Sequence, residues 1–497
     1  MEEGDSSSTG DPLEGLLYDQ ANLEELCAER PLDWDEYAHM NEFHGNAIVI
    51  KQYAGLPLDE PLPFAIEHAI PYDLSEAYDY DLQCGLSVYL AVREESAAIY
   101  QRAGMPVVHS IGSTYLYAKE WFRRLHPEVG EVKRRGTLVF PDKSTLLMDT
   151  DFDREAFAKR LVELPAEYQP VVVCTYWKDY VRQLHKPYEN AGLRVVSCGH
   201  LRDGQFLLRL HDLCRRFRYS CANDIAGSFV MSILSGCHFF YLPAGPLTQS
   251  KHGSIGTFER DPTLEKQRKA ECLASAPFPP EDPTLQRRLV AAHAGVVHFR
   301  SVEAIRACYN DAVKGLGEEI CPCHIAFGES TDVQLLYRLR PIGIDRDGWA
   351  GRRASLRVAN PAAIGGLRLK LELTNPSVGE RARTEVYVAG RLICTLASPP
   401  YAFEIGIPIP PCEGEVWMEF VSNNDILLHN DPRRRAIRFC SIELVERGTM
   451  VELELPAGAK VPQVKPAKKA PQKSTEKVSS VIRLGRRLRR FFSRART

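Results

Sequence analysis

The chain has 497 residues, of which 44% are hydrophobic and 26% charged, and its formal net charge is −3. This composition excludes a disordered chain and is sufficient for the cores of about two to four domains. The charge is uneven, because the last 39 residues carry 13 lysines and arginines and only one acid. We therefore expect an acidic body followed by a basic tail that meets an anionic partner.

The first 130 residues predict a Rossmann-like unit. Apolar runs at 46–55, 64–70, 86–92 and 105–112 are interpreted as strands, and 95–104 as a helix that ends at Gly104. A helix and a basic connector follow at 114–135. The polar, acidic start of the chain differs from a secretory signal, so we expect a cytoplasmic protein with reduced cysteines.

Residues 131–315 predict a second α/β unit. Its apolar runs at 171–175, 193–198 and 238–242 alternate with helical segments, which indicates a parallel sheet covered by helices. Ligands of such sheets bind at the carboxyl ends of the strands. Polar and small residues occupy these ends, namely Tyr176, Lys178, Asp179, His200, Asn223, Gly227 and Ser228. The backbone amides of a helix opening near Gly227 are expected to attract a phosphate.

The run from Ile225 to Gly245 has no charged residue and is about long enough to cross a bilayer. It is interrupted at Gly236, so we expect a buried helix that ends there and a strand at 238–242. Two further helical segments at 281–315 complete this unit, the second of them capped by Ser301. Cys321, Cys323 and His324 lack a second ligand pair at zinc spacing, and no metal site is expected.

After a connector at 316–345, residues 346–454 alternate between short strands and turns, which predicts an all-β sandwich with a tight hairpin across Ala389-Gly390. Residues 455–497 are a Pro/Lys linker and a basic amphipathic helix. We expect residues 478–497 to lie on an anionic membrane surface and hold the protein at the inner face of the plasma membrane. No nucleic acid is expected as a partner, and a plain solubilising tail is the weaker alternative.

Several segments together carry a resemblance to a known family. Gly136-Thr-Leu-Val-Phe-Pro-Asp-Lys-Ser-Thr145, the run at 169–180 and the run at 217–242 resemble bacterial glycosyltransferases of the GT-B fold that build surface polysaccharides. The resemblance covers about residues 44–315 and includes Ile66-Glu67-His68, where such enzymes often have an E-H-G element. The β-rich segment is similar to accessory β-sandwiches of such transferases. In two positions the chain departs from the pattern, with Lys143 in place of histidine and Ala69 in place of glycine.

The resemblance implies two Rossmann-like lobes and a metal-independent transfer of sugar from a nucleotide-sugar to a surface or lipid-linked glycan. It implies Glu67 and His68 as catalytic residues. The implied donor-binding residues are Lys143, Ser144, Thr145, Tyr176, Lys178, His200, Asn223, Gly227 and Ser228. A degenerate transferase that serves as a glycan-binding or assembly module and a sugar-nucleotide epimerase are the alternatives. Plainer roles also remain open for these residues, such as helix capping for Ser144-Thr145 and packing for Tyr176.

Overall fold

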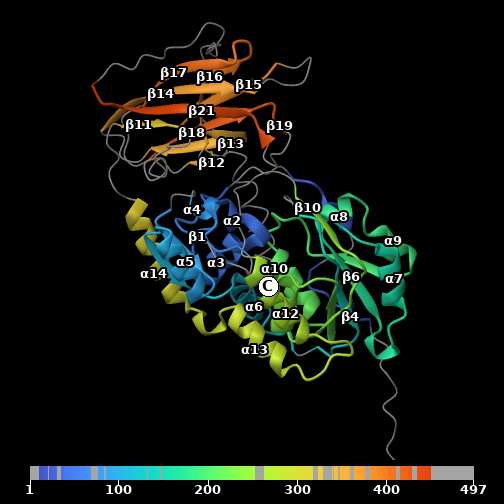
Figure 1. Cartoon of the computed structure of the whole chain (residues 1–497). Coiled ribbons are helices and arrows are strands. Elements are labelled where there is room, and N and C mark those ends of the chain that lie inside the picture. Colours follow the sequence, from blue (N-terminus) through green and yellow to red (C-terminus); the bar gives the residue numbers. More distant parts are fainter. Residues whose placement is uncertain are drawn as a thin grey trace, which may run out of the picture.

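The computed structural model describes residues 11–448, apart from 19, 21, 31–34, 69–76, 83–85, 131, 146–147, 252–261, 317–322, 328–338, 340, 345–346, 359–362, 375–380, 410–414 and 428–433. These residues form a mixed α/β body, coloured blue to yellow in Figure 1, and a nearly closed β-sheet domain, coloured orange to red. Within them, no helix is long and apolar enough to span a membrane. The predicted linker and basic tail at 455–497 lie outside the described residues.

The first α/β unit is built on a small parallel sheet with the order β1-β2-β3. Its strands coincide with apolar runs that the sequence predicts as strands, and α5 coincides with the predicted helix. The elements are α1 (Leu23–Cys27), α2 (His39–Glu42), η1 (Phe43–Gly45), α3 (Asn46–Ala54), β1 (Ala65–Ile66), α4 (Asp79–Leu82), β2 (Val88–Ala91), α5 (Glu94–Arg102), β3 (Val107–Ser110) and α6 (Thr114–Leu125).

The prediction of a strand at 46–55 is wrong, because this segment is the helix α3. Gly45 and Gly55 flank the helix, and both have the left-handed backbone that commonly ends helices. Val49, Ile50 and Tyr53 are buried at helical spacing. A short apolar run fits both the helical and the strand periodicity, and here packing against α6 favours the helix.

The second α/β unit contains a parallel sheet with the order β7-β6-β4-β8-β9. From β4 the chain adds β6 and then β7 on one side of the sheet. It then adds β8 and β9 on the other side, which is the doubly wound arrangement. Its elements are β4 (Thr137–Phe140), β5 (Met148–Asp151), α7 (Arg154–Val162), η2 (Ala166–Tyr168), β6 (Val171–Thr175), α8 (Trp177–Val181), α9 (Lys186–Asn190), β7 (Arg194–Ser197), α10 (Phe206–Cys214), β8 (Tyr219–Ala222), α11 (Gly227–Leu234), β9 (His238–Tyr241), β10 (Thr248–Lys251) and α12 (Pro262–Ala274).

Helices cover both faces of this sheet. Leu138 and Val172 belong to the core shared with α10, whereas Val139 and Val173 belong to the core beneath α7 and α9. Strands that are buried on both faces have continuous apolar runs, as β6 does. The uncharged run after Ile225 is the helix α11 followed by β9, as predicted.

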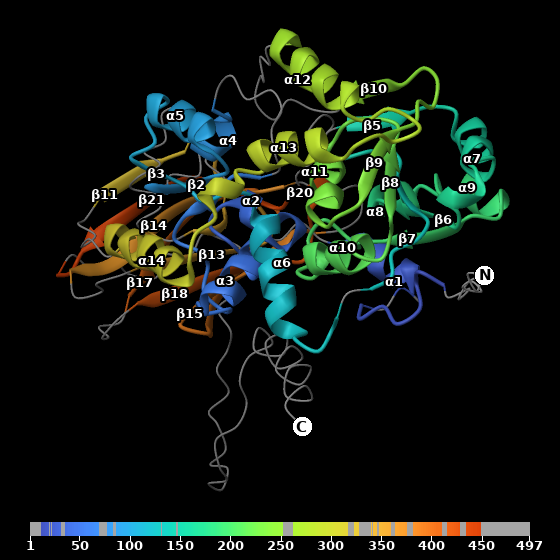
Figure 2. The same ribbon diagram turned by 90° about the horizontal axis from the view of Figure 1, so that it is seen from below.

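The chain then returns to the first unit. Helix α13 (Thr284–His293) packs on α11, the short η3 (Val296–His298) follows, and α14 (Val302–Leu316) packs on α3. The Arg306 side chain donates through Nε to the carbonyl of Ala54 at 2.6 Å. Figure 2 shows α13 beside α11 and α14 beside α3.

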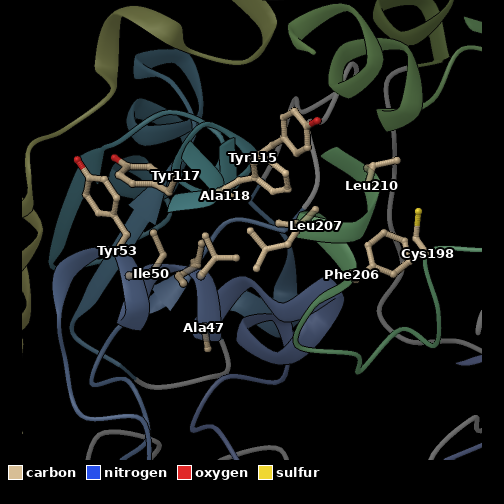
Figure 3. Close-up of a cluster of buried hydrophobic side chains, with 14 of the residues drawn as sticks. Ala47, Ile50, Tyr53, Tyr115, Tyr117, Ala118, Cys198, Phe206, Leu207 and Leu210 are labelled. Carbon is tan, nitrogen blue, oxygen red and sulfur yellow. The ribbon is translucent and has the colours of Figure 1, made fainter. Parts of the chain in front are cut away.

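One hydrophobic core joins the two α/β units. Figure 3 shows residues of α3 and α6 packed against Leu207 and Leu210 of α10. Tyr115 of α6 extends this contact, because its hydroxyl lies 3.2 Å from Nδ1 of His211 in α10. The units are therefore in direct contact on the side of α6 and α10.

The β-sheet domain confirms the strands predicted between 346 and 454. Its main strand order is β16-β15-β18-β13-β21-β14-β17, and the tight hairpin joins β15 to β16 through Ala389 and Gly390, both of which have positive φ. The strands are β11 (Cys323–Ala326), β12 (Ile342–Ile344), β13 (Trp349–Val358), β14 (Ile364–Leu373), β15 (Arg383–Val388), β16 (Arg391–Ala397), β17 (Ala402–Pro408), β18 (Val416–Ser422), β19 (Ile426–Leu427), β20 (Arg434–Arg435) and β21 (Ile437–Glu446).

The segment 316–345, expected as a connector, contributes two strands to this domain. Strand β11 pairs with β21, and β12 pairs with β13. Ile342 of β12 also packs against a buried cluster of the first α/β unit that contains Tyr89 and Tyr100. The β-sheet domain thus contacts the first unit through β12.

Candidate functional site

The strand order of the second unit reverses between β4 and β8, and polar residues follow both strands there. The amide of Asp142, after β4, donates to Oδ1 of Asn223, after β8, at 2.6 Å. Asn223 is 5% exposed, and its Nδ2 has no hydrogen-bond partner among the described residues. A buried amide group with an unused donor is costly, so it indicates a place where a ligand oxygen could bind.

Helix α11 begins directly after Asn223. Ala226 is its N-cap, and an alanine side chain cannot accept a hydrogen bond from the first amides of the helix. A Cβ at Gly227 would meet only the Met231 side chain, at 3.4 Å, and Ser228 is half-buried. The first backbone amides of the helix are therefore candidates to bind an anion.

Lys143 follows β4 by three residues, and its ammonium group lies 4.5 Å from the centre of the Tyr176 ring, after β6. Burial lowers the pKa of Lys143, and burial raises that of the Tyr176 hydroxyl. Both side chains are half-buried. The pair places a cation at the carboxyl ends of two neighbouring strands.

Two histidines of the first unit meet this pair. The rings of His44 and His68 stack at 5.2 Å, and Nε2 of His44 lies 3.5 Å from the Tyr176 hydroxyl. Burial and then the Lys143 charge lower the pKa of His68 to about 4. Burial, with smaller effects of His68 and Lys143, also lowers that of His44 well below its usual value. Both imidazoles are therefore neutral at pH 7.

Close backbone contact holds His44 in this position. His44 has a left-handed φ of 56°, and its amide donates to the carbonyl of Leu201 at 2.6 Å. A Cβ on the next residue, Gly45, would lie 2.6 Å from the carbonyl oxygen of Gly204. Only glycine allows this approach between the two units.

Glu67 has different surroundings from its neighbour His68. Its Oε2 accepts a hydrogen bond from the Val92 amide at 2.5 Å, and the residue is 2% exposed. Burial raises the pKa of Glu67 to about 7, against the lowering by Val92, Ser96 and Arg93. The two predicted catalytic residues thus lie in separate networks.

Three predicted donor-binding residues belong to an internal network around two aspartates. The Ser144 amide donates to both carboxylate oxygens of Asp179, at 3.2 and 3.3 Å, and Ser144 is fully buried. Lys178 donates to the carbonyl of Thr145 at 2.6 Å and to Oδ1 of Asp149 at 3.0 Å. These contacts connect α8 to β5 and to the segment between β4 and β5. The predicted capping role of Ser144-Thr145 is not seen, since Asp153 caps α7.

His200 is fully buried after β7, with its ring 4.2 Å from that of Trp177. Its Nδ1 accepts from the amide of Arg202 at 3.1 Å. Burial, with smaller effects of Arg30 and Arg202, lowers the pKa of His200 to about 3. The sequence missed His44 because the following segment was interpreted as a strand, although the His44-Gly45 pair before an apolar run was a signal for a helix start.

The structure thus brings together Lys143, Tyr176, His68 and His44 at the junction of the two units, and Asn223 with the start of α11 at the strand reversal. Among the described residues, no group of three or more His, Cys, Asp or Glu side chains is arranged to hold a metal ion.

The sequence matches no protein-family model and no curated protein. Structural neighbours include a glycosyltransferase, the pneumococcal O-GlcNAc transferase GtfA in complex with UDP and GlcNAc. It is 11% identical, with 54% of each chain covered and a TM-score of 0.25.

Other neighbours are carbohydrate-active proteins. A family 35 carbohydrate binding module from an environmental isolate is 18% identical over 20% of this chain and 69% of the module, with a TM-score of 0.14. A family two carbohydrate esterase from Clostridium thermocellum is 9% identical over 20% of this chain, with a TM-score of 0.14. The match covers about a quarter of that esterase, 26% of its length.

Proposed function

We propose that the chain is a glycosyltransferase that moves a sugar from a nucleotide-sugar to a glycan acceptor. The observation that carries this proposal is the strand reversal between β4 and β8, where Asn223 has a buried, unused N–H donor directly before the uncapped start of α11. Sheets of this kind bind nucleotides at such a reversal. In this proposal the diphosphate accepts hydrogen bonds from the amides near Gly227 and Ser228.

Cleavage of the bond between sugar and phosphate requires stabilisation of the negative charge that develops on the departing diphosphate. Lys143 is our candidate cation, since it follows β4 beside the reversal. Its half-buried position strengthens the attraction, because screening by water is weak there. This role gives a function to the lysine that replaces histidine in the resembling enzymes.

The acceptor hydroxyl needs a group that can take its proton if the transfer inverts the sugar. We propose His68 for this role, with His44 as its stacked neighbour, because its imidazole lies beside Lys143 and its Nδ1 has no hydrogen-bond partner among the described residues. Its lowered pKa makes it a weak base at pH 7. Glu67 has a weaker claim, since its carboxylate is hydrogen-bonded to Val92. The return of the chain through α13 and α14 to α3 also agrees with two lobes of a GT-B enzyme.

The finer features of the proposal concern the acceptor and the location. The acceptor is a surface polysaccharide or a lipid-linked glycan, and the protein is peripheral at the cytoplasmic face of the membrane, held by residues 478–497. The β-sheet domain binds the acceptor or stiffens the enzyme. The proposals for the acceptor and for the β-sheet domain are motivated by the sequence resemblance, and the proposed location by the charge of the tail.

The test is a panel of nucleotide-sugars, measured first by calorimetric binding and then by nucleotide release with and without glycan acceptors. We expect one donor to bind and to release its nucleotide faster when an acceptor is present. Replacing Lys143 with Ala should lower turnover about 100-fold. Lys159→Ala, on the exposed face of α7, is the matched control and should turn over normally. Equal turnover of the two variants would remove Lys143 from the mechanism.

A non-catalytic binding module is the second candidate, and the engagement of Glu67 and Ser144 in internal hydrogen bonds favours it. In that case nucleotide-sugar or glycan binds, and no acceptor accelerates nucleotide release. An epimerase is recognised by interconversion of the sugar-nucleotide in the absence of any acceptor.

A further inference from the structure

An exposed apolar stripe runs along α13 and continues through η3. Leu285, Arg288 and Ala292 share one exposed face of α13 at helical spacing. Val296 and Val297 follow in η3, and Val297 is 88% exposed, the highest value among the large apolar side chains of the described residues. Such a side chain protrudes from the surface instead of lining a groove.

The same segment is positively charged. Residues 283–302 contain three arginines and neither aspartate nor glutamate, and Arg287, Arg288 and Arg300 are all exposed. The nearest acid on the following helix, Glu303, is engaged with Ser301 and the start of α14. Two acids, Glu281 and Asp282, directly precede α13, and hydrogen bonds from Thr284 together with the Arg287 charge lower the pKa of Asp282. The stripe thus combines aliphatic side chains with the exposed cations Arg288 and Arg300.

The segment η3, which carries Val296 and Val297, packs firmly against the first α/β unit. The ring of Phe299 lies 4.8 Å from that of Tyr117 and 5.8 Å from that of Tyr53. The Tyr53 hydroxyl donates to the carbonyl of Arg300 at 2.8 Å. A Cβ on Gly295 would lie 2.1 Å from the carbonyl oxygen of Val92, so the turn before η3 is pressed against the first unit. The valines are therefore presented on a fixed base.

We propose that this stripe, defined by Leu285, Arg288, Ala292, Val296 and Val297, docks on an anionic lipid surface. Protruding aliphatic side chains insert between lipids, while flanking arginines bind the headgroup phosphates. A second copy of the chain fits less well, because a symmetric contact would bring arginines against arginines. Figure 1 places α13 on the side of the α/β body away from the β-sheet domain, which would then project from the membrane. The inference is independent of sugar transfer and of the tail.

Insertion is measured directly with Val297→Trp in the full chain. The variant is mixed with vesicles of phosphatidylcholine and phosphatidylglycerol in a 7:3 ratio, with and without bromine on the acyl chains. Val162→Trp is the matched control, since Val162 is 47% exposed on α7. We expect bromine to quench the new fluorescence of Val297→Trp and not that of Val162→Trp. Equal quenching of the two variants overturns the proposal, even if the tail binds the vesicles.

The charge is tested by vesicle sedimentation of Arg288→Ala. The loss of one surface arginine should weaken binding about fivefold, and high salt should remove this difference. Arg102→Ala, at the exposed end of α5, should bind as the parent chain does. Unchanged binding of Arg288→Ala contradicts the proposal. A dimer that Val297→Asp dissociates in the absence of lipid would also contradict it, and would assign the stripe to a second copy.

Discussion

The carboxyl ends of the two parallel sheets differ in how their polar groups are used. At the end of the first sheet, Glu67 accepts from the Val92 amide, and Nη1 of Arg93 lies 3.2 Å from Nδ1 of His293 in α13. At the end of the second sheet, Asn223 has an unused donor beside the uncapped start of α11. Oε1 of Glu67 and Nδ1 of His68, at the first end, also have no hydrogen-bond partner among the described residues. The ends therefore differ in the kind of group they offer, since the second places an N–H donor beside the backbone amides of α11, which suits an anion.

Two buried asparagines show the same contrast. In the first unit, Asn41 donates through Nδ2 to the carbonyl of Phe64 at 2.8 Å and accepts through Oδ1 from the Ile66 amide at 2.9 Å. In the second unit, Asn223 only accepts, from Asp142. A buried amide with both groups bonded stabilises a fold, and one with a spare donor is typical of a binding site. The difference indicates a structural role for Asn41 and a ligand role for Asn223.

The largest effect is expected from Gly45→Ala, which breaks the contact that brings His44 of the first unit to the second sheet end. The new Cβ would overlap the carbonyl of Gly204, and alanine resists the φ of 76°. We expect a loss of about 3 kcal/mol in the free energy of unfolding, measured by chemical denaturation. Gly104→Ala is the control, since its φ is also positive but no atom lies within 4 Å, and it should cost about 1 kcal/mol. Equal losses would show that the contact with Gly204 is not tight.

Glu67→Ala tests whether the first sheet end is structural. The substitution leaves the buried Val92 amide without its acceptor, so the free energy of unfolding should fall by about 2 kcal/mol. Nucleotide affinity should not change, because the carboxylate lies in a network separate from that of Lys143. Glu67→Gln keeps an acceptor oxygen and should retain both stability and turnover. A stable Glu67→Gln variant without turnover would instead assign Glu67 to catalysis and remove the contrast between the two ends.

These contrasts were only partly predictable from the sequence. Apolar runs bounded by Gly, Pro and polar residues correctly placed β2, β3, β6, β7 and β9. The pairing of β5 with β10 was not predicted, because both strands are polar and distant in sequence. The order of strands, and hence the position of the reversal, also depends on non-local pairing.

For the candidate site, the sequence predicted which residues follow strands, but it did not predict which residues they contact. Tyr176 and Asn223 were named correctly as residues at strand ends, and Lys143 was named through the resemblance. The hydrogen bonds of Ser144 and Lys178 with Asp179 and Asp149 depend on how two loops meet, which no local pattern contains. His44 reaches the site from another unit, through a contact between Gly45 and Gly204 that only the folded chain forms.

The contact between the two units can be tested through the pH dependence of stability, because His211 of the second unit lies at this contact. Its Nδ1 lies 3.3 Å from the Ser235 hydroxyl, and burial, with Lys119 and Arg215, lowers its pKa to about 3. The folded state keeps this imidazole neutral, while the unfolded chain takes up a proton below pH 6.5, so stability falls as the pH falls. From pH 7 to 5 the parent chain should lose about 2 kcal/mol more than His211→Gln. Parallel curves from denaturation at several pH values would contradict this.

The smallest effect, and the most direct test of the contrast, is expected from Asn223→Asp compared with Asn41→Asp. Asn223→Asp keeps the acceptor for the Asp142 amide and removes the spare donor, so its loss of stability comes from the buried carboxylate alone and should be smaller than that of Asn41→Asp. Donor affinity should fall at least about tenfold, because a diphosphate would lose a hydrogen bond and meet a carboxylate. Asn41→Asp should show the opposite pattern, with lower stability, since Phe64 loses its donor, and unchanged nucleotide affinity in the folded protein. If both variants bind nucleotide as the parent does, Asn223 has no ligand role, and the nucleotide must bind elsewhere.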